Sequence, residues 1–251
     1  KPINVLKNTK IKLADNMELK LIQYALGISP GVDYMKPEAK KDIHYTKIGI
    51  AADNDYDGYA ICNLLINLFV NRYTNLFESG AIKFFIQVSP LLKVWYKGNT
   101  SGSEADANFF NLNEYKVWCS SSNYREHTAK YYKGLASYEL EDLDEFIVTR
   151  REVNLASPEK VDRDTIQLIF GDKEEDRRKE WITTNMKSLD QIIIPSSTES
   201  SIMGYMNPSM LHFACYDLGR HIPSLMDCFV VVMRKVLYGM LKLNIKEAMK
   251  V

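Results

Sequence analysis

The sequence predicts an α/β fold in which a parallel sheet is flanked by helices, and two neighbouring segments carry this prediction. Ile48 to Ala52 is a compact apolar run without a helical period, which is typical of a buried parallel strand. From Gly58 to about Phe77, apolar residues recur at helical spacing, and Gly80 offers a stop. The local order is therefore a strand, a turn and a helix.

The elements around this unit follow from the same patterns. Asn16 to Leu26 has helical spacing, so a short helix precedes the strand. Ile82 to Val88 is predicted as the next strand, and Leu91 to Tyr96 is expected to continue the same sheet after a Ser-Pro break. Glu139 to Glu145 has the acidic composition of the first turns of a helix.

The second half of the chain is predicted to be mainly helical. Val161 to Phe170 and Glu174 to Met186 form an α-rich subdomain, and the charges of the second helix favour ion pairs within it. Asp190 to Pro208, rich in Ser, Thr, Gly and Pro, is expected to be a linker. Leu211 to Leu218 and Val231 to Leu243 are helices of a second unit.

Composition limits the class of protein. The 251 residues are 46% hydrophobic, enough for a sizeable core, and the 32 basic and 32 acidic residues give no net charge. Any DNA contact must therefore come from local basic clusters. The four cysteines lie far apart without a CxxC pair, which argues against a zinc site or a secreted disulfide framework and favours a reducing, intracellular location. The longest strongly apolar stretch, Phe229 to Met233, is too short to span a bilayer, and the N-terminus lacks a leader pattern.

Three aspartates stand at alternate positions just after the first strand. Asp53, Asp55 and Asp57 would point to one side of an extended segment, and a turn at Gly58 would gather them around one or two cations. Carboxylates this close repel one another, so a divalent cation is expected, with Mg2+ the leading candidate. Such a cluster favours phosphoryl transfer, because the cation can stabilise charge on the attacking and leaving oxygens.

Two other interpretations of the aspartates compete with the magnesium site. A calcium EF-hand loop also begins Asp-x-Asp-x-Asp-Gly, but its twelfth position is a bidentate Glu and here is Leu64. The acidic run could also be a solvated loop, although its place at the end of a buried strand disfavours this.

Five segments in order along the chain resemble type IIA DNA topoisomerases. The aspartate motif resembles the acidic motif of their toprim domain. The others resemble the stretch before it, the lysine-glycine-leucine motif, the arginine-lysine-glutamate-tryptophan helix and the entrance to the DNA-gate domain. These segments are Lys1 to Val5 with Glu18-Leu19, Asp53 to Gly58, Lys130 to Leu135, Asp176 to Trp181, and Arg220 to Asp227 with Arg234 to Tyr238. The passage from toprim to gate segments within one chain is similar to eukaryotic, viral and some phage enzymes.

The resemblance implies a fold and a domain organisation. The fold would be a toprim domain, with a Rossmann-like parallel sheet flanked by helices, an α-rich subdomain and the start of a winged-helix gate domain. The expected boundaries are 1–150 for the toprim metal-binding domain, 151–190 for the α-rich extension, 191–208 for the linker and 209–251 for the start of the gate domain.

The resemblance also implies roles for individual residues and the partners they serve. Asp53 and Asp55 would bind the Mg2+ that assists cleavage and religation of double-stranded DNA, with Asp57 supporting or sharing a second metal. The residues expected to contact DNA are Lys133, Arg220, Arg234 and Lys235. The chain would act with the rest of the topoisomerase in a homodimer, and ATP would bind a domain outside it. The compartment would be intracellular: the nucleus if eukaryotic, or the host-cell cytoplasm or viral replication site if viral or phage.

Parts of the family pattern are expected outside this chain. The upstream Glu-Gly-Asp-Ser motif is expected before Lys1 and the nucleophilic tyrosine after Val251, since none of the 15 tyrosines matches it. The chain is thus expected to be a central fragment that does not cleave DNA alone.

Three departures from the family pattern affect the site. Tyr59 and Ala60 replace a Ser-His pair, Ala136 replaces a glycine, and the loop from Cys228 to Met233 lacks a lysine and a proline of the gate motif. The apolar run in that loop is expected to pack or to extend a helix and to contact phosphate less.

Two alternatives to a topoisomerase remain at this point. One is another toprim enzyme, a primase or a nuclease, which would not supply the gate-entry segment. The other is a divergent, non-catalytic DNA-binding or assembly module, which the altered gate loop supports.

Overall fold

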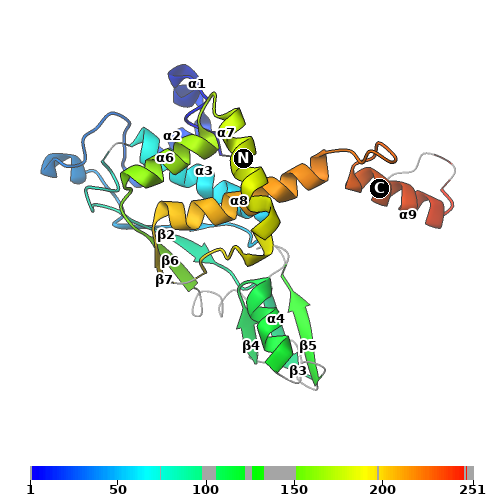
Figure 1. Ribbon diagram of the computed structural model, residues 1–251. Coiled ribbons are helices and arrows are strands. Elements are labelled where there is room, and N and C mark those ends of the chain that lie inside the picture. Colours follow the sequence, from blue (N-terminus) through cyan, green and yellow to red (C-terminus); the bar gives the residue numbers. More distant parts are fainter. Residues whose placement is uncertain are drawn as a thin grey trace.

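The computed structural model describes residues 2–73, 75–97, 106–121, 126–132, 151–196, 198–245 and 247 (Figure 1). Its α-helices are α1 Lys10–Asp15, α2 Met17–Leu26, α3 Tyr56–Arg72, α4 Leu112–Ser121, α6 Lys160–Phe170, α7 Glu175–Asn185, α8 Ile202–His221 and α9 Val231–Lys242, with 3-10 helices η1 Pro37–Lys40 and η4 Met186–Gln191. Its strands are β1 Lys47–Ala51, β2 Lys83–Val88, β3 Leu92–Tyr96, β4 Ala107–Phe109, β5 His127–Tyr131, β6 Arg151–Leu155 and β7 Thr198–Ser200.

The main sheet has four strands in the order β1-β2-β6-β7. β1 and β2 are parallel, with Ala51 opposite Gln87 at their carboxyl ends, whereas β6 is antiparallel to β2. The prediction of a parallel strand followed by a long helix is confirmed by β1 and α3. The predicted burial of the strand is wrong, because β1 lies at the edge of the sheet and only its Ile50 is buried. Because both parallel strands end at one edge, the residues that follow them are brought together there, as is typical of ligand sites in α/β sheets.

The segment Leu91 to Tyr96 was expected to continue the main sheet, but it belongs to a second sheet. β3 does not continue the main sheet; it lies between β4 and β5 in a separate antiparallel sheet. With α4 this sheet forms a lobe that projects from the helical body (Figure 1). Its small apolar core contains Leu91, Leu92, Val94 and Phe109. The Ser-Pro break marked a change of sheet, which local sequence patterns do not distinguish from a bend within one strand.

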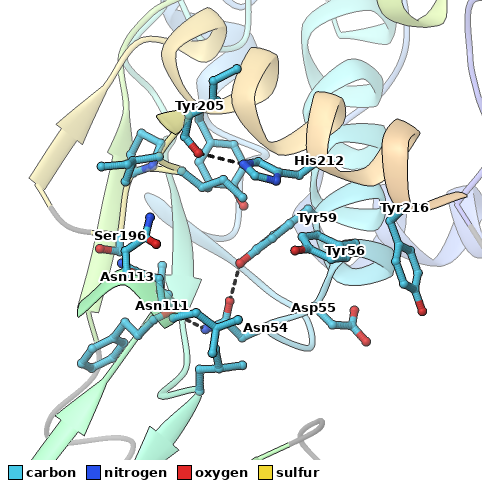
Figure 2. Close-up of a pocket in the computed structure, with 18 of the residues that line it drawn as sticks. Asn54, Asp55, Tyr56, Tyr59, Asn111, Asn113, Ser196, Tyr205, His212 and Tyr216 are labelled. Atoms are coloured by element: carbon cyan, nitrogen blue, oxygen red, sulfur yellow. Dashed lines mark hydrogen bonds between the residues drawn. The ribbon is translucent and has the colours of Figure 1, made fainter. Parts of the chain in front are cut away.

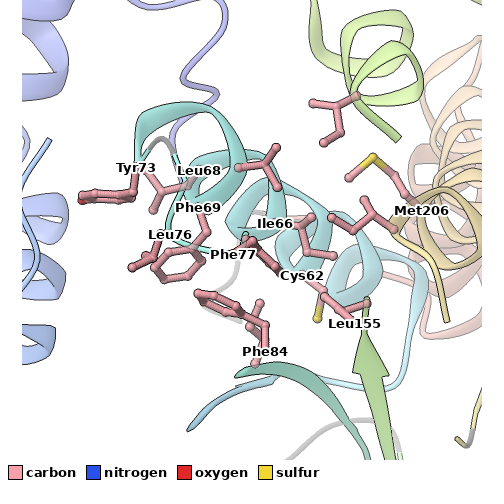
Figure 3. Packing of buried hydrophobic residues seen from close by; sticks show 14 of the residues in the cluster. Cys62, Ile66, Leu68, Phe69, Tyr73, Leu76, Phe77, Phe84, Leu155 and Met206 are labelled. Carbon is pink, nitrogen blue, oxygen red and sulfur yellow. The ribbon is translucent and has the colours of Figure 1, made fainter. Parts of the chain in front are cut away.

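The main core lies between α3, α8 and the large sheet. Ile66 of α3, Met206 of α8 and Val153 of β6 are fully buried in this core. The aromatic rings of Phe77 and Phe84 stack on each other within the same cluster (Figure 3). Removing a buried side chain of this size typically destabilises a protein by roughly 2–5 kcal/mol. The helix that begins at the aspartates is therefore firmly held by this core.

The segment expected to be a linker is largely regular structure. Thr198–Ser200 is β7, which pairs with β6, and α8 begins at Ile202 and runs through Pro208. The predicted linker is therefore wrong over 198–208. The prediction rested on the proline and serine content of the segment, but Pro208 lies inside α8. The domain boundary at 208/209 stays a prediction, and α8 crosses it.

The last helix, α9, projects away from the body beyond the end of α8 (Figure 1). The apolar run Phe229 to Met233 was expected to pack or to extend a helix. Its last three residues, Val231 to Met233, do form the first turn of α9. These side chains are exposed, however, as are Leu225 and Met226 in the preceding loop. In the described part of the chain, no helix is both long and apolar enough to cross a membrane.

Candidate metal and nucleic-acid site

The three aspartates occupy three different backbone environments. Asp53 follows β1 in an irregular bend and is exposed. Asp55 is the N-cap of α3, where its Oδ1 accepts a hydrogen bond from the backbone N–H of Gly58 at 2.7 Å. Asp57 already belongs to the first helical turn. The expected alternation along an extended segment is therefore wrong, because the helix begins at Tyr56 and not after Gly58.

Gly58 lets the acidic bend fold back over the start of α3. A Cβ at this position would lie 1.9 Å from the carbonyl oxygen of Asp53 and 2.9 Å from its carbonyl carbon. Both atoms are backbone, so they cannot move aside as a flexible side chain could. The close approach of Asp53 to α3 thus requires glycine at position 58.

Asn54 anchors the bend from within the aspartate motif. Its Nδ2 donates to the carbonyl oxygens of Ser89 at 2.8 Å and Phe110 at 2.9 Å, which ties the bend to the end of β2 and to the projecting lobe. The hydroxyl of Tyr59 donates to Asn54 Oδ1 at 2.7 Å (Figure 2). Burial raises the pKa of Tyr59 well above its ordinary value, so its hydroxyl stays protonated and remains a donor. Sequence reasoning marked Tyr59 as a departure from the family pattern but did not find Asn54.

Arg220, at the last turn of α8, pairs with Asp57 across 163 positions of the chain. Its Nη1 and Nη2 donate to the two carboxylate oxygens of Asp57, each at 2.7 Å. Nε and Nη2 also donate to Asp217 at 2.9 and 2.8 Å. These two carboxylates raise the pKa of Arg220 further above its already high value. The structure therefore brings Arg220, expected to contact DNA, next to one of the expected metal ligands.

A cavity of about 420 Å3 opens beside the aspartates (Figure 2). One wall is aromatic: Tyr56 stacks on His212 with ring centroids 5.9 Å apart, and Tyr216 lies 5.0 Å from Tyr56. Another part of the lining is mainly aliphatic and includes Ile192 to Pro195. His212 also bonds the carbonyl oxygen of Ile192 through Nε2 at 2.8 Å. This aromatic wall was missed at the sequence level because its members come from two helices far apart in the chain.

Two of the aspartates fit the coordination chemistry of Mg2+. Mg2+ is usually held by one or two carboxylates together with waters and substrate phosphates. Asp53 is exposed, and the helix cap uses one oxygen of Asp55, so these two suit that donor set. Asp57 does not suit it while both of its oxygens accept from Arg220. Among the described residues, no group of three or more His, Cys, Asp or Glu side chains is arranged to hold a metal ion, so the assignment of all three stays a prediction.

The other predicted DNA contacts lie apart from the aspartates or outside the described residues. Lys133 is outside them. Arg234 and Lys235 are exposed on α9, and Arg234 pairs with Asp227, with its Nε 2.8 Å from Oδ2. Arg234 also lowers the pKa of Asp227 to about 2.

The charged helix α7 uses its cations mainly within the helix, as predicted. Arg177 pairs with Glu174 and Lys179 with Asp176, both at i,i+3 spacing. Arg178 also donates to the carbonyl oxygen of Gly171 at the end of α6. These contacts confirm a structural role for the arginine-lysine segment.

Comparison with known proteins gives consistent matches. The family model for the C-terminal associated domain of TOPRIM matches residues 87–218. DNA topoisomerase 2 of Saccharomyces cerevisiae is 29% identical over 255 residues, which cover all of this chain and 17% of that protein. DNA topoisomerase 2-alpha of Homo sapiens is 29% identical over 266 residues, again covering all of this chain and 17% of that protein. The crystal structure of the Plasmodium falciparum topoisomerase II DNA-binding, cleavage and re-ligation domain superposes with a TM-score of 0.75 at 27% identity, covering 98% of this chain and 32% of that one.

Proposed function

The chain belongs to the family of C-terminal associated domains of TOPRIM, and from this premise we propose that it serves as the central part of an ATP-dependent type II DNA topoisomerase. It is homologous along its whole length to the central region of type II DNA topoisomerases. Because it spans about a sixth of the length of these relatives, their full activity comes to this chain only as part of the proposal.

The observation that carries the proposal is the acidic bend at the carboxyl edge of the parallel strands. Asp53 and Asp55 would hold Mg2+ there, and Asp57 would support or share a second metal. When bound, Mg2+ would stabilise charge on the phosphate oxygens during cleavage and religation of DNA. The chain's own residues supply the geometry: Asp55 caps α3, Gly58 permits the close bend, and Asn54 fixes it to β2.

The same proposal extends to partners and location. Double-stranded DNA would be the substrate, and the residues that contact it would be Lys133, Arg220, Arg234 and Lys235. The enzyme would be a homodimer. It would act inside the cell, in the nucleus if the source is a eukaryote. ATP would bind a domain outside this chain, and the nucleophilic tyrosine would come from another part of the enzyme. Without them this chain would not cleave DNA.

A chimera tests the proposal. This chain replaces the aligned 255 residues of the Saccharomyces cerevisiae enzyme, and relaxation of supercoiled plasmid is measured with ATP and Mg2+. We expect relaxation by the chimera and its loss in the chimera carrying Asp53→Ala. A folded, dimeric chimera that relaxes DNA equally well with and without Asp53 would contradict the metal role, and one that never relaxes DNA would contradict the proposed function.

The non-catalytic alternative keeps one specific support. The gate-entry loop is altered, and Arg234, next to it, is already paired with Asp227. Under this alternative the unmodified chain would bind DNA with the same affinity with and without Mg2+.

A further inference from the structure

Arg220 is nearly saturated by two carboxylates. A guanidinium has five N–H donors. Four of them are used: the Nε–H and one from Nη2 on Asp217, and one each from Nη1 and Nη2 on Asp57. The fork on Asp57 is bidentate, the arrangement that matches guanidinium and carboxylate best.

The surroundings hold this pair in place. Asp57 lies in the first turn of α3 and Arg220 in the last turn of α8, so each charge complements its own helix dipole. The guanidinium also lies over the ring of Tyr216, with its Cζ 4.9 Å from the centroid, and Tyr216 contacts Tyr56 in the acidic motif. The side chains of Arg220 and Asp57 are 28% and 33% exposed, which limits solvent screening.

This geometry conflicts with a metal ion at Asp57. Mg2+ would need an oxygen of Asp57 at about 2.0–2.1 Å, and the fork leaves each of these oxygens only its second lone pair. It would also lie next to the positive charge of Arg220, and like charges at contact distance repel strongly. Metal at Asp57 and the pair with Arg220 are therefore alternatives.

We propose that Arg220 withholds Asp57 from divalent metal, so that Asp57 becomes a metal ligand only when the end of α8 releases it. This inference rests on the proposed metal role of the acidic bend, and it goes further by making Arg220 a residue that determines how many aspartates serve that role. Release would also free the guanidinium fork for phosphate, because it cannot hold a phosphate bidentately while it holds both carboxylates. Occupation of Asp57 by metal is thus linked to the position of the α8 end and of the segment that leads to α9.

A double-mutant cycle on the full 251-residue chain tests the proposal, with Mn2+ as the probe and titration calorimetry as the measurement. In the wild-type background, Asp57→Asn is expected to change the Mn2+ Kd by less than about threefold, because Arg220 already holds Asp57. In the Arg220→Gln background, the same substitution is expected to weaken Mn2+ binding about tenfold, equivalent to about 1.4 kcal/mol. An equal effect in both backgrounds, or no effect in either, would overturn the proposal.

Two further variants test whether the loss of positive charge alone, and not the loss of the contact with Asp57, changes Mn2+ binding. Arg234→Gln removes the same charge from an ion pair on a different helix and is expected to leave the effect of Asp57→Asn unchanged. Arg220→Lys keeps the positive charge but loses the bidentate contact with Asp57. It can replace Arg220→Gln in the double-mutant cycle if that variant does not fold. In the Arg220→Lys background, Asp57→Asn is again expected to weaken Mn2+ binding more than it does in wild type.

Asp53→Asn distinguishes failure of the inference from failure of the proposed function. It is expected to weaken Mn2+ binding in every background. If the Asp57 cycle behaves as expected while Asp53→Asn has no effect, the inference stands and the metal role of Asp53 is wrong. If Asp53→Asn weakens binding but the cycle shows no coupling, the metal role stands and the inference is overturned.

Discussion

Replacement of Gly58 by alanine is expected to destabilise the chain and to displace the acidic bend. In an unobstructed helix this change is favourable by about 0.8–1 kcal/mol, because alanine has the higher helix propensity. Here the new Cβ would lie 1.9 Å from the carbonyl oxygen of Asp53. An ordinary contact begins at about 3.4 Å, so the bend would have to move by more than an ångström, and overpacking of this kind typically costs about 1–3 kcal/mol. The net expectation is destabilisation.

Gly219 provides the matched control for this prediction. It lies near the end of α8, and a Cβ built on it meets no atom within 4 Å. Gly219→Ala is therefore expected to leave stability unchanged or to raise it, by up to about 1 kcal/mol. Urea denaturation followed by circular dichroism measures both variants, and Mn2+ titration reports whether the bend has moved. If Gly58→Ala proved as stable as Gly219→Ala, the account of the bend would be refuted.

Three further predictions concern groups outside the acidic bend. Asp162→Ala is expected to lower the free energy of unfolding by roughly 1–3 kcal/mol in urea denaturation, because this buried carboxylate accepts backbone N–H groups at the starts of both α6 and α8. Cys62 is expected to resist a thiol reagent at pH 8 while Cys228 reacts, because Cys62 is buried with its pKa raised to about 12 and Cys228 is exposed. The carboxyl signal of Asp227 is expected to titrate near pH 2 by NMR and to move toward about 3.9 in Arg234→Gln.

Each of these predictions has a control and a contradicting result. Asp164 is exposed in the same helix as Asp162, so Asp164→Ala should leave stability nearly unchanged, and equal losses would refute the double-cap role of Asp162. Cys228→Ser should abolish the labelling assigned to Cys228, and fast labelling located at Cys62 by peptide mass spectrometry would contradict its burial. The folded-state pKa of Asp227 is lowered, so its contribution to stability is present above the unfolded pKa and is lost as pH falls toward 2. An unchanged midpoint in Arg234→Gln would show that the pair does not hold in solution.

The strand and helix around the aspartates could be predicted because their patterns are local. The apolar run of β1 and the helical spacing of α3 depend only on neighbouring residues. β6 was not predicted, because Arg151–Leu155 mixes charged and apolar residues and becomes a strand through its pairing with β2. β7 is only three residues long and also depends on β6. Such strands form because they pair with residues far away in the sequence, and local propensity does not predict this pairing.

The candidate site shows the same division. The aspartates and the glycine after them follow one another in the sequence, and the motif identified them directly. The pair of Asp57 and Arg220 joins residues 163 positions apart, and no local pattern indicates it. Arg220 was expected to contact DNA because the resemblance places it at the gate entrance. Asp217 is a partner within the same helix, but only the packing of α8 against α3 shows that the guanidinium also pairs with Asp57.

The central claim is that the acidic bend binds a divalent cation through Asp53, and Mg2+ titration of the thermal unfolding temperature tests it most directly. A ligand that binds only the folded state stabilises it by about 2.7 kcal/mol at a hundredfold excess over Kd, so the unfolding temperature of the wild-type chain should rise with Mg2+. Asp176→Ala, which removes an exposed carboxylate from α7, should retain this rise, and Asp53→Ala should lose it. An equal rise in Asp53→Ala and wild type would contradict the account.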